Sequence, residues 1–446
     1  MKKVLTILLA LAIILVVVAC GNNNGGATPA GGSNSGAAPT GGSDGGATPA
    51  GGNDSGGSES SGGSGGTGET VAAGDPIKIG LIIPLTGIFQ LHGPIDEQTF
   101  RLGLEYATQG TNTVLGRPIQ VIVEDDASDV GTAVQKARKL IEQDGVIALA
   151  GVQTTAICNA VMAVAEEYKI PLMGHMAASN TLTSVDLSRY FFSMAPNNTM
   201  KAQVVSNYMF STFGEGLKIA LLLPDYSWGY DIADAFSTLF GDRVTAFDVV
   251  YAPLETKDFN PYLQRIVQYE PDVFFFDWSG DTRPNMFLQV HELGIDTSIP
   301  CISGWSQEVM DIEIMNNSPE IIGTINYAPS IANTAVSDWY ITEYNARYGG
   351  WPGNSLIAPS FTSAQVLVKA ISEAGSTDAD ALISAMEGMV IDSLKGTYTI
   401  RAEDHIALQK INIAQLVPGP NGEITYKVMA ETDPSEYPLP KEIKGR

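Results

Sequence analysis

The strongest constraint on the fold is a regular alternation of short apolar runs with segments whose apolar residues recur at helical spacing. The apolar runs have the length of buried strands, and the segments between them have the length of helices. Such alternation predicts a parallel sheet covered by helices on both faces. The runs of the first series are residues 77–83, 117–124, 146–151 and 170–173.

The same alternation restarts further along the chain, with predicted strands at 218–223, 244–251, 272–277 and 299–302. Two series predict an α/β fold made of two doubly wound parallel-sheet lobes. In such sheets ligands bind beyond the carboxyl ends of the strands, so we expect the functional residues in the loops that follow the strands.

From Ile321 onward the pattern changes to late helices followed by late strands, which suits a chain that crosses back between the lobes. We expect a three-crossing hinge near Ala195, Asn326 and Ser393. The predicted domains are lobe 1, made of 76–195 and 327–392, and lobe 2, made of 196–326 and 393–446.

The N-terminus changes character at Cys20. Lys2 and Lys3 precede an apolar run of about 16 residues, which has the features of a secretory signal. The segment Val17-Val-Ala-Cys20 resembles a lipobox, so we expect a signal peptide at 1–19 and lipidation of Cys20. The alternative is an uncleaved transmembrane anchor. In both cases the rest of the chain lies outside the cytoplasmic membrane.

Residues 20–75 are dominated by Gly, Ser, Asn, Ala, Thr and Pro and contain no aromatic residue. This composition cannot bury enough apolar surface to offset the entropy of ordering, so we predict a disordered tether.

Charge and residue types exclude several function classes. The formal net charge of −24 argues against nucleic-acid binding and against adhesion to anionic lipid. Cys158 and Cys301 are expected as buried thiols, with a disulfide left open. The four histidines are scattered, and no spacing suits a zinc site, so neither a metal nor a cofactor is expected. The acids of 124–126 resemble a strand end with helix-capping carboxylates, and no catalytic set is evident, so an enzyme is not expected.

Several segments resemble one known family. They are Ile77-Lys-Ile-Gly-Leu-Ile-Ile-Pro-Leu-Thr-Gly87, Leu115-Gly-Arg-Pro-Ile-Gln-Val-Ile-Val-Glu-Asp-Asp126, Gly131-Thr-Ala-Val-Gln-Lys-Ala-Arg-Lys-Leu-Ile141, Asp225-Tyr-Ser-Trp-Gly229 and Arg401-Ala-Glu-Asp-His405. In order and spacing they are similar to the type I solute-binding proteins of ABC importers, in the branched-chain amino acid-binding branch. The resemblance covers about residues 76–430. It implies a solute bound between two closing lobes and delivery of that solute to a membrane permease.

Within lobe 1, the resemblance implies ligand contacts at three loops. In the loop 151–155, Thr155 takes the position of a family Ser, and Thr154 or Thr155 can equally be a helix N-cap. In the loop 177–183, Ala178 replaces a family Thr, so one hydroxyl that helps hold an ammonium is absent. The expected ligand-binding residues of these loops and of the first loop are Gln90, His92, Thr154, Thr155, Ala177, Ala178 and Ser179.

Within lobe 2, Trp228 stands where a family aromatic covers the ligand, and a core role at a helix start is the alternative. Gly304 and Trp305 lie where the family often carries an acid for an ammonium. Asp277 is a candidate replacement, equally readable as a loop acid or a helix cap. The expected ligand-binding residues here are Tyr226, Trp228, Asp277, Trp278, Gly304 and Trp305. The three tryptophans suit a bulkier or less polar solute than leucine.

Two binding functions remain open on these observations. The first is a monomeric lipoprotein that captures a branched-chain amino acid-like, amide or aromatic solute for an ABC importer permease. The second is a sensor in which the same module signals to a membrane receptor. The sequence shows no fused signalling domain, which favours the importer.

Overall fold

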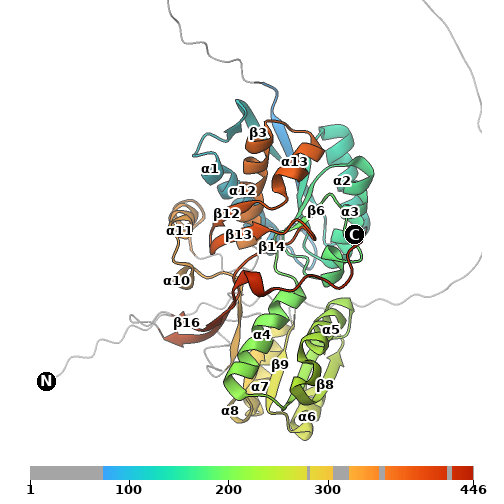
Figure 1. Ribbon diagram of the computed structural model, residues 1–446, viewed down its shortest axis with the longest axis vertical. Coiled ribbons are helices and arrows are strands. Elements are labelled where there is room, and N and C mark those ends of the chain that lie inside the picture. Colours follow the sequence, from blue (N-terminus) through green and yellow to red (C-terminus); the bar gives the residue numbers. More distant parts are fainter. Residues whose placement is uncertain (1–73, 279–281, 305–320, 351–356, 419–423, 445–446) are drawn as a thin grey trace, which may run out of the picture. The chain divides into compact units, whose positions relative to one another are not determined.

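The computed structural model describes residues 74–278, 282–304, 321–350, 357–418 and 424–444. The expected signal peptide, Cys20 and most of the expected tether lie outside these residues, as does Trp305. The described residues contain two large sheets with helices on both faces, which confirms the predicted α/β fold (Figure 1).

The first sheet has the strand order β2-β3-β1-β4-β5-β6, and its pairs are parallel except for β2 with β3. The second sheet has the order β16-β15-β11-β10-β9-β7-β8, with a parallel part from β8 to β11 and an antiparallel pair at its other edge. The strands of the first sheet are β1 (Ile77–Ile83), β2 (Thr113–Val114), β3 (Arg117–Asp125), β4 (Ala148–Gly151), β5 (Leu172–Gly174) and β6 (Phe191–Ser193).

The strands of the second sheet are β7 (Leu217–Pro224), β8 (Val244–Ala252), β9 (Val273–Phe276), β10 (Cys301–Ser303), β11 (Ile322–Ile325), β15 (Asn412–Pro418) and β16 (Ile424–Glu431). A third, small sheet contains β12 (Val390–Ser393), β13 (Gly396–Ile400) and β14 (Ala407–Leu408). The described helices are α1 (His92–Ala107), α2 (Val130–Lys139), α3 (Thr155–Tyr168), α4 (Asn198–Phe213), α5 (Ser227–Phe240), α6 (Asn260–Tyr269), α7 (Arg283–Glu292), α8 (Ile295–Ser298), α10 (Pro329–Ala332), α11 (Ala335–Tyr348), α12 (Ile357–Ala374) and α13 (Ala379–Met386).

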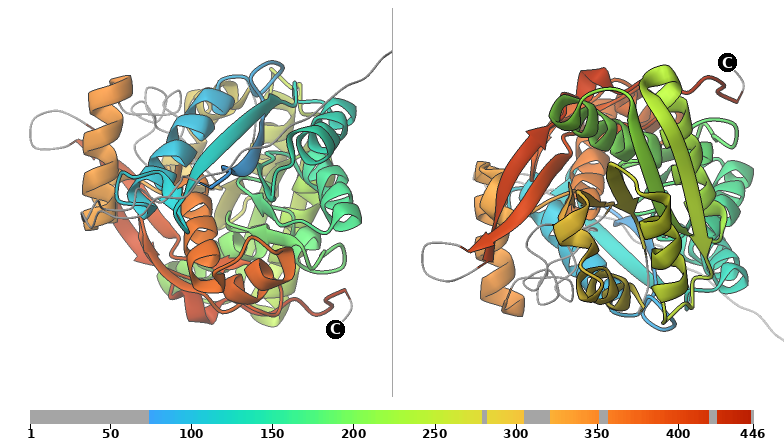
Figure 2. Two further views of the ribbon diagram at one scale, coloured as in Figure 1. Left: turned by 90° about the horizontal axis from the view of Figure 1, so that it is seen from above. Right: turned by 90° about the horizontal axis from the view of Figure 1, so that it is seen from below.

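Successive side chains of β1 enter different cores, as the pleat of a strand requires. Ile79 and Leu81 pack under α1 and α12, whereas Ile82 packs under α2 and α3. The same division holds for β7, where Leu221 faces α4 and α5 and Leu222 faces α6 and α7. Figure 2 shows the helices distributed on both sides of each sheet. The strands therefore read as continuous apolar runs because both of their faces are buried.

The chain passes from the first sheet to the second after β6 and returns after β11. The proposed crossings near Ala195 and Asn326 directly follow these two strands. The third crossing lies later than the expected position at Ser393. Tyr398 and Ile400 of β13 pack into the core of the first lobe, and the chain rejoins the second sheet only at Asn412. The alternation of Thr397-Tyr-Thr-Ile400 explains this difference, because it buries its apolar face in a hairpin on lobe 1.

Polar side chains connect the crossings. Gln409 is buried and donates from Nε2 to the Met194 carbonyl, 2.8 Å away, which joins the first crossing to the third. Buried Lys395 donates from Nζ to Asn326 Oδ1 at the second crossing. These hydrogen bonds therefore lie in the segments that connect the lobes, which are the segments that would change conformation if the lobes moved relative to one another.

The final residues return to lobe 1, again unlike the expected boundary. Tyr437 packs into the core beside α4, and Arg401 donates to its carbonyl. Ile443 packs against the α3 side of lobe 1, and the Lys444 backbone N–H donates to the Ser184 carbonyl at 3.0 Å. The segment from Tyr437 to Lys444 therefore contacts both lobes.

Candidate functional site

The loop after β1 is held by a carboxylate at the end of β3. Asp125 accepts hydrogen bonds from the backbone N–H groups of Leu85 and Thr86 and from the Thr86 hydroxyl, at 2.8, 3.1 and 2.7 Å. Burial raises the pKa of Asp125. These hydrogen bonds and one from Ala127 together lower the pKa by more than burial raises it, so the pKa of Asp125 lies below its ordinary value. Asp125 therefore has a structural role, as expected from the sequence for the acids of 124–126.

Of the two residues expected in this loop, Gln90 is exposed and His92 is half-buried at the start of α1. His92 Nδ1 lies 3.1 Å from Gln153 Oε1. His92 therefore connects the first loop to the loop after β4.

The loop after β4 leads directly into α3. Gly151 has φ +109°, and a Cβ there would lie 2.1 Å from the Ile82 carbonyl oxygen, so only glycine fits. Thr154 caps α3, because its hydroxyl accepts from the Ile157 N–H at 3.3 Å. Thr155, half-buried, is the first residue of the helix. The N-terminus of α3 therefore presents backbone N–H groups and hydroxyls at the carboxyl end of β4.

Gln153 adds a buried donor to this helix start. Its side chain is 6 % exposed, and its Nε2 has no hydrogen-bond partner among the residues that the structure describes. A buried amide N–H group without an acceptor destabilises the protein, and a bound ligand that accepts its hydrogen bond removes this penalty. Gln153 was missed from the sequence because a lone glutamine carries no motif.

The loop after β5 carries the next three expected residues. Ala177 and Ala178 are buried, and the Ala178 carbonyl accepts from the Asn198 N–H at 2.9 Å. The Ser179 hydroxyl caps a short 3-10 turn by accepting from Thr181 N–H at 3.3 Å. The structure thus uses Ala178 and Ser179 to connect this loop with α4 and with its own turn.

The carboxyl ends of the two sheets meet at Asp231 of α5. Its Oδ2 accepts from the backbone N–H of Asn180 at 2.7 Å and from the Asn198 side chain at 3.0 Å. Burial raises the pKa of Asp231, although both hydrogen bonds lower it. Asn180 follows β5 of lobe 1, and α5 follows β7 of lobe 2. Loops that follow strands of both sheets therefore form one contact region, where ligands of doubly wound sheets are found.

Trp228 lies in this region. It is half-buried in the first turn of α5, and its Nε1 donates to Asn198 Oδ1 at 3.2 Å. The ring of Tyr226, at the N-cap of α5, lies 6.0 Å from the Trp228 ring. Both expected aromatic residues of this loop therefore lie where the two lobes meet. Trp228 also packs against the core of lobe 2, which is the alternative role considered for it from the sequence.

A buried cation lies beneath Trp228. Lys201 of α4 is 6 % exposed, and its Nζ lies 5.3 Å from the centre of the Trp228 ring. The same Nζ lies 3.9 Å from Oδ2 of Asp277, which is 2 % exposed. Burial raises the pKa of Asp277 to about 6, although Lys201 and Arg283 lower it. Burial lowers the pKa of Lys201 to about 8, although Asp277 and Asp231 raise it.

Gly304 makes room for this carboxylate. A Cβ at Gly304 would lie 2.2 Å from Cγ of Asp277, and the Gly304 N–H donates to the Phe276 carbonyl at 2.9 Å. The expected residues Asp277 and Gly304 are therefore in direct contact. Trp305, which was also expected to contact the ligand, lies outside the described residues.

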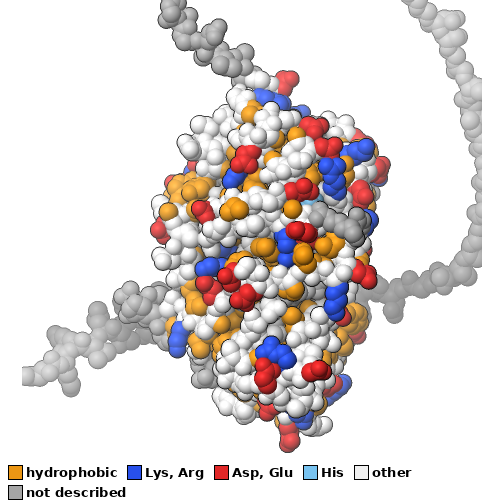
Figure 3. Space-filling view, in the orientation of Figure 1, with side chains coloured by type: hydrophobic (Ala, Val, Ile, Leu, Met, Phe, Trp, Pro, Cys, Tyr) orange, Lys and Arg blue, Asp and Glu red, His pale blue; other side chains and the backbone are white. Residues whose placement is uncertain are grey.

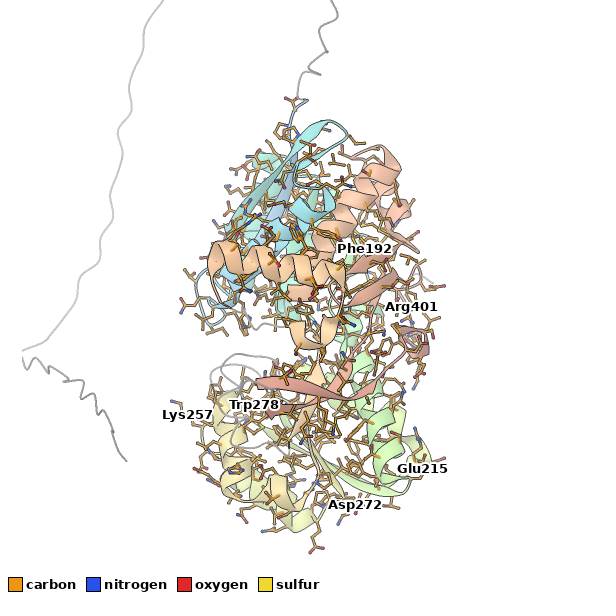
Figure 4. The ribbon with its side chains drawn as sticks, turned by 90° about the vertical axis from the view of Figure 1, so that its left-hand side faces the viewer. Phe192, Glu215, Lys257, Asp272, Trp278 and Arg401 are labelled. Atoms are coloured by element: carbon orange, nitrogen blue, oxygen red, sulfur yellow. The ribbon has the colours of Figure 1, made fainter. Side chains whose placement is uncertain are left out.

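Trp278 has a different environment from the one expected. It is 2 % exposed, packs edge-on against Phe259 at 4.9 Å between ring centres, and donates from Nε1 to Thr282 Oγ1 at 3.0 Å. Figure 4 shows it in lobe 2, at the end of the sheet opposite Asp272, which precedes β9. Trp278 therefore packs within lobe 2, and its described contacts are with that lobe.

Sequence reasoning missed the residues of α4 and α5 that complete the region: Asn198, Lys201 and Asp231. The helix α4 was not predicted, because it is buried on several sides and shows no single apolar stripe. A lysine within such an apolar segment was the one available signal, since buried lysines are rare without a partner.

Comparison with known proteins identifies the family. The model of the periplasmic binding protein family matches residues 76–422. The chain belongs to this family. It is a binding protein rather than an enzyme, and the family works outside the cytoplasm. This confirms the coarse part of the resemblance noted from the sequence.

Individual relatives are distant but cover most of the chain. Leu/Ile/Val-binding protein homolog 6 of Brucella melitensis is 24% identical over 364 residues, 79% of this chain and 90% of that protein. The structure of an ABC-type branched-chain amino acid transporter from Rhodopseudomonas palustris has a TM-score of 0.72 at 28% identity, and covers 82% of this chain and 100% of that one. A solute-binding protein of an ABC transporter from the same species, in complex with 3,4-dihydroxybenzoic acid, has a TM-score of 0.69 at 25% identity, with 82% and 99% covered.

Other expected features concern cysteines, metals and the membrane. Cys158 and Cys301 are buried free thiols, as expected, and burial raises the pKa of both. Within the described ranges, no group of His, Cys, Asp and Glu side chains is arranged to hold a metal ion. In the same ranges, no helix combines the length and apolarity needed to cross a membrane.

Proposed function

We propose that this chain is the extracytoplasmic solute-binding component of an ABC importer and that it captures a small carboxylate-bearing solute where the two lobes meet. The similarity to binding proteins of ABC transporters supports the role. The observation that carries the ligand class is the start of α3, where Gln153 offers a buried Nε2 donor beside the helix N-terminus. A carboxylate there accepts from the amide, from hydroxyls and from backbone N–H groups, and the helix dipole favours its charge.

The proposed ligand set contains His92, Gln153, Thr155, Ala177, Tyr226, Trp228 and Asp277, with Gln90, Thr154, Ala178, Ser179 and Gly304 shaping the surrounding loops. His92 fixes the amide of Gln153 by contact with its Oε1, which leaves Nε2 for the solute. Trp228 and Tyr226 supply an aromatic wall from the other lobe. Closing of the lobes on the solute would then present the complex to a permease.

The experiment is isothermal titration of the full chain, purified in detergent, with small carboxylic acids and with their primary amides. We expect binding of at least one acid, with its amide at least tenfold weaker, because the helix N-terminus favours an anion. The Gln153→Leu variant should weaken the acid by about tenfold or more, which corresponds to about 1.4 kcal/mol. Equal affinity for acids and amides, or unchanged binding by Gln153→Leu, would contradict the proposed ligand class.

We also propose that the mature chain is anchored through lipid on Cys20, with residues 20–75 as a tether. The support is the sequence at 17–20 and the apolar run before it. Intact-mass analysis of membrane fractions tests this: the wild type should carry acyl chains after cleavage before residue 20. The Cys20→Ser variant should lack them, and retention of lipid by that variant would refute the anchor.

A further inference from the structure

We infer that Lys201, held beside Asp277 and under Trp228, makes the lobe 2 end of the site selective for a hydroxyl group and against the ammonium of an α-amino acid. This inference rests on the proposed function, because it describes the opposite end of the same solute. It assigns Lys201 a specificity role that the sequence motifs do not indicate.

Two cations lie near the buried carboxylate of Asp277. A lone buried carboxylate would attract an ammonium, which was the role considered for Asp277 from the sequence. In the structure Lys201 Nζ lies 3.9 Å from Asp277 Oδ2, and both side chains are almost fully buried. Arg283, 7 % exposed at the start of α7, acts on Asp277 as a second nearby cation. A third cation brought to this carboxylate would be repelled by two that are already there.

Asp277 and Lys201 have opposite hydrogen-bonding chemistry. Asp277 Oδ1 has no hydrogen-bond partner among the described residues, and an ionised carboxylate only accepts. The Lys201 ammonium only donates. A hydroxyl group does both, so one hydroxyl can donate to Asp277 and accept from Lys201. An ammonium can satisfy only Asp277, and an aliphatic side chain satisfies neither.

Aromatic rings lie beside this pair of charges. Lys201 Nζ faces the Trp228 ring at 5.3 Å, and Tyr226 stands beside that ring. Lobe 1 contributes the loop 177–179, whose Ala178 carbonyl accepts from the Asn198 N–H of α4 at 2.9 Å. An aromatic body packed against the Trp228 ring, with a carboxylate at the start of α3 and a hydroxyl at Lys201 and Asp277, would contact each of these groups. The solute class is therefore a small hydroxy-substituted aromatic carboxylate that lacks an ammonium.

The test titrates the full chain with 3,4-dihydroxybenzoate, 4-hydroxybenzoate, benzoate, L-phenylalanine and L-leucine. We expect the hydroxybenzoates to bind at least tenfold tighter than benzoate and at least a hundredfold tighter than L-phenylalanine. In Lys201→Met the hydroxyl preference should fall below threefold. L-Phenylalanine should gain affinity at least tenfold in this variant, because its ammonium can then pair with Asp277.

The matched control is Lys218→Met. Lys218 also lies in lobe 2 and also faces an aromatic ring, that of Tyr269 at 4.3 Å, but at the amino end of the sheet. Its substitution should leave the ligand order unchanged. If Lys201→Met does not fold, Asp277→Asn provides the second test, because it removes only the negative charge. In this variant the preference for the hydroxybenzoates over benzoate should fall below threefold, because the charged acceptor for the hydroxyl is lost, and an undiminished preference would overturn the inference.

The results of these titrations distinguish the inferred hydroxyl selectivity from the proposed binding of a carboxylate. Wild-type binding of L-phenylalanine or L-leucine as tightly as the hydroxybenzoates would overturn the inference and leave the proposed carboxylate-binding function standing. An unchanged hydroxyl preference in Lys201→Met would do the same. Absence of binding by every carboxylate tested, including L-leucine, would overturn the proposed ligand class and the inference together.

Discussion

At the scale of residues, the site is defined by buried polar groups whose partners come from different elements. Lys201 on α4, Asp277 after β9 and Trp228 on α5 are distant in sequence and adjacent in the fold. The motif at 225–229 identified Trp228, because it follows a strand directly. No comparable pattern identified Lys201, since its partners become visible only when α4 is placed. Individual loop residues were thus predictable, whereas the charge balance between them was not.

Replacing Trp228 by Ala should weaken solute binding by about tenfold or more with little loss of stability, because the ring is only half-buried and faces the site. Titration calorimetry measures the first effect and thermal unfolding the second. Trp339→Ala is the control, since Trp339 packs on Tyr106 and Phe361 within lobe 1. It should lower the melting temperature and leave affinity intact. The opposite pattern for the two variants would contradict the placement of Trp228.

Asp277 should also affect how stability depends on pH. Its pKa is raised to about 6, so the folded state holds more protons than the unfolded state between about pH 4 and pH 6. Stability from this group is present below about pH 4 and is lost as the pH rises through 6. Asp126, whose pKa burial also raises to about 6, contributes in the same direction.

Urea unfolding from pH 4 to pH 6 measures this dependence. Asp277→Asn should show a smaller fall in unfolding free energy across the interval than the wild type, with the contribution of Asp126 remaining. Identical slopes in the two proteins would show that Asp277 has no raised pKa.

At the scale of elements, strands bounded by turn residues were the most predictable features. The runs at 77–83 and 218–223 became β1 and β7 because continuous apolar runs suit strands buried on both faces. The strand β6 and the helix α4 were not predicted. The strand has only three residues, and α4 is buried on several sides, so neither carries a clear period. The resemblance of motifs supplied the loops that periodicity alone could not identify.

The loop after β1 should depend on one carboxylate. Asp125→Ala removes three hydrogen bonds to Leu85 and Thr86 and should cost about 1–3 kcal/mol of unfolding free energy. Hydrogen exchange should show faster exchange of the N–H groups at 85–90.

Asp129→Ala is the matched control, because Asp129 caps α2 by accepting from Thr132. It should cost about 1 kcal/mol without changing exchange at 85–90. Equal exchange in the two variants would contradict the role given to Asp125.

At the scale of the whole molecule, the region from residue 74 to 444 contains two lobes connected by three crossings and by the segment 437–444. Predicting two lobes required only the repeated alternation. The position of the third crossing and the course of the final segment depended on packing of Tyr398 and Ile443 that no local pattern reveals. On the face in Figure 3, acidic and basic side chains are interspersed.

Removing residues 440–446 should favour separation of the lobes. It deletes the Lys444–Ser184 backbone hydrogen bond and the packing of Ile443 on lobe 1. Small-angle scattering of the ligand-free protein should show a larger radius of gyration, and solute affinity should fall severalfold. Lys444→Ala keeps the backbone bond and loses only the exposed pair with Glu166, so it should match the wild type. Equal dimensions of the truncated and full chains would refute this role for the segment.

The most direct test of the central claim, that both lobes hold one carboxylate-bearing solute, is native mass spectrometry of the full chain with a panel of carboxylic acids. The account predicts one bound acid per chain, with its occupancy strongly reduced in both Gln153→Leu in lobe 1 and Trp228→Ala in lobe 2. An acid retained by both variants, or a folded protein that binds no carboxylate, would contradict it.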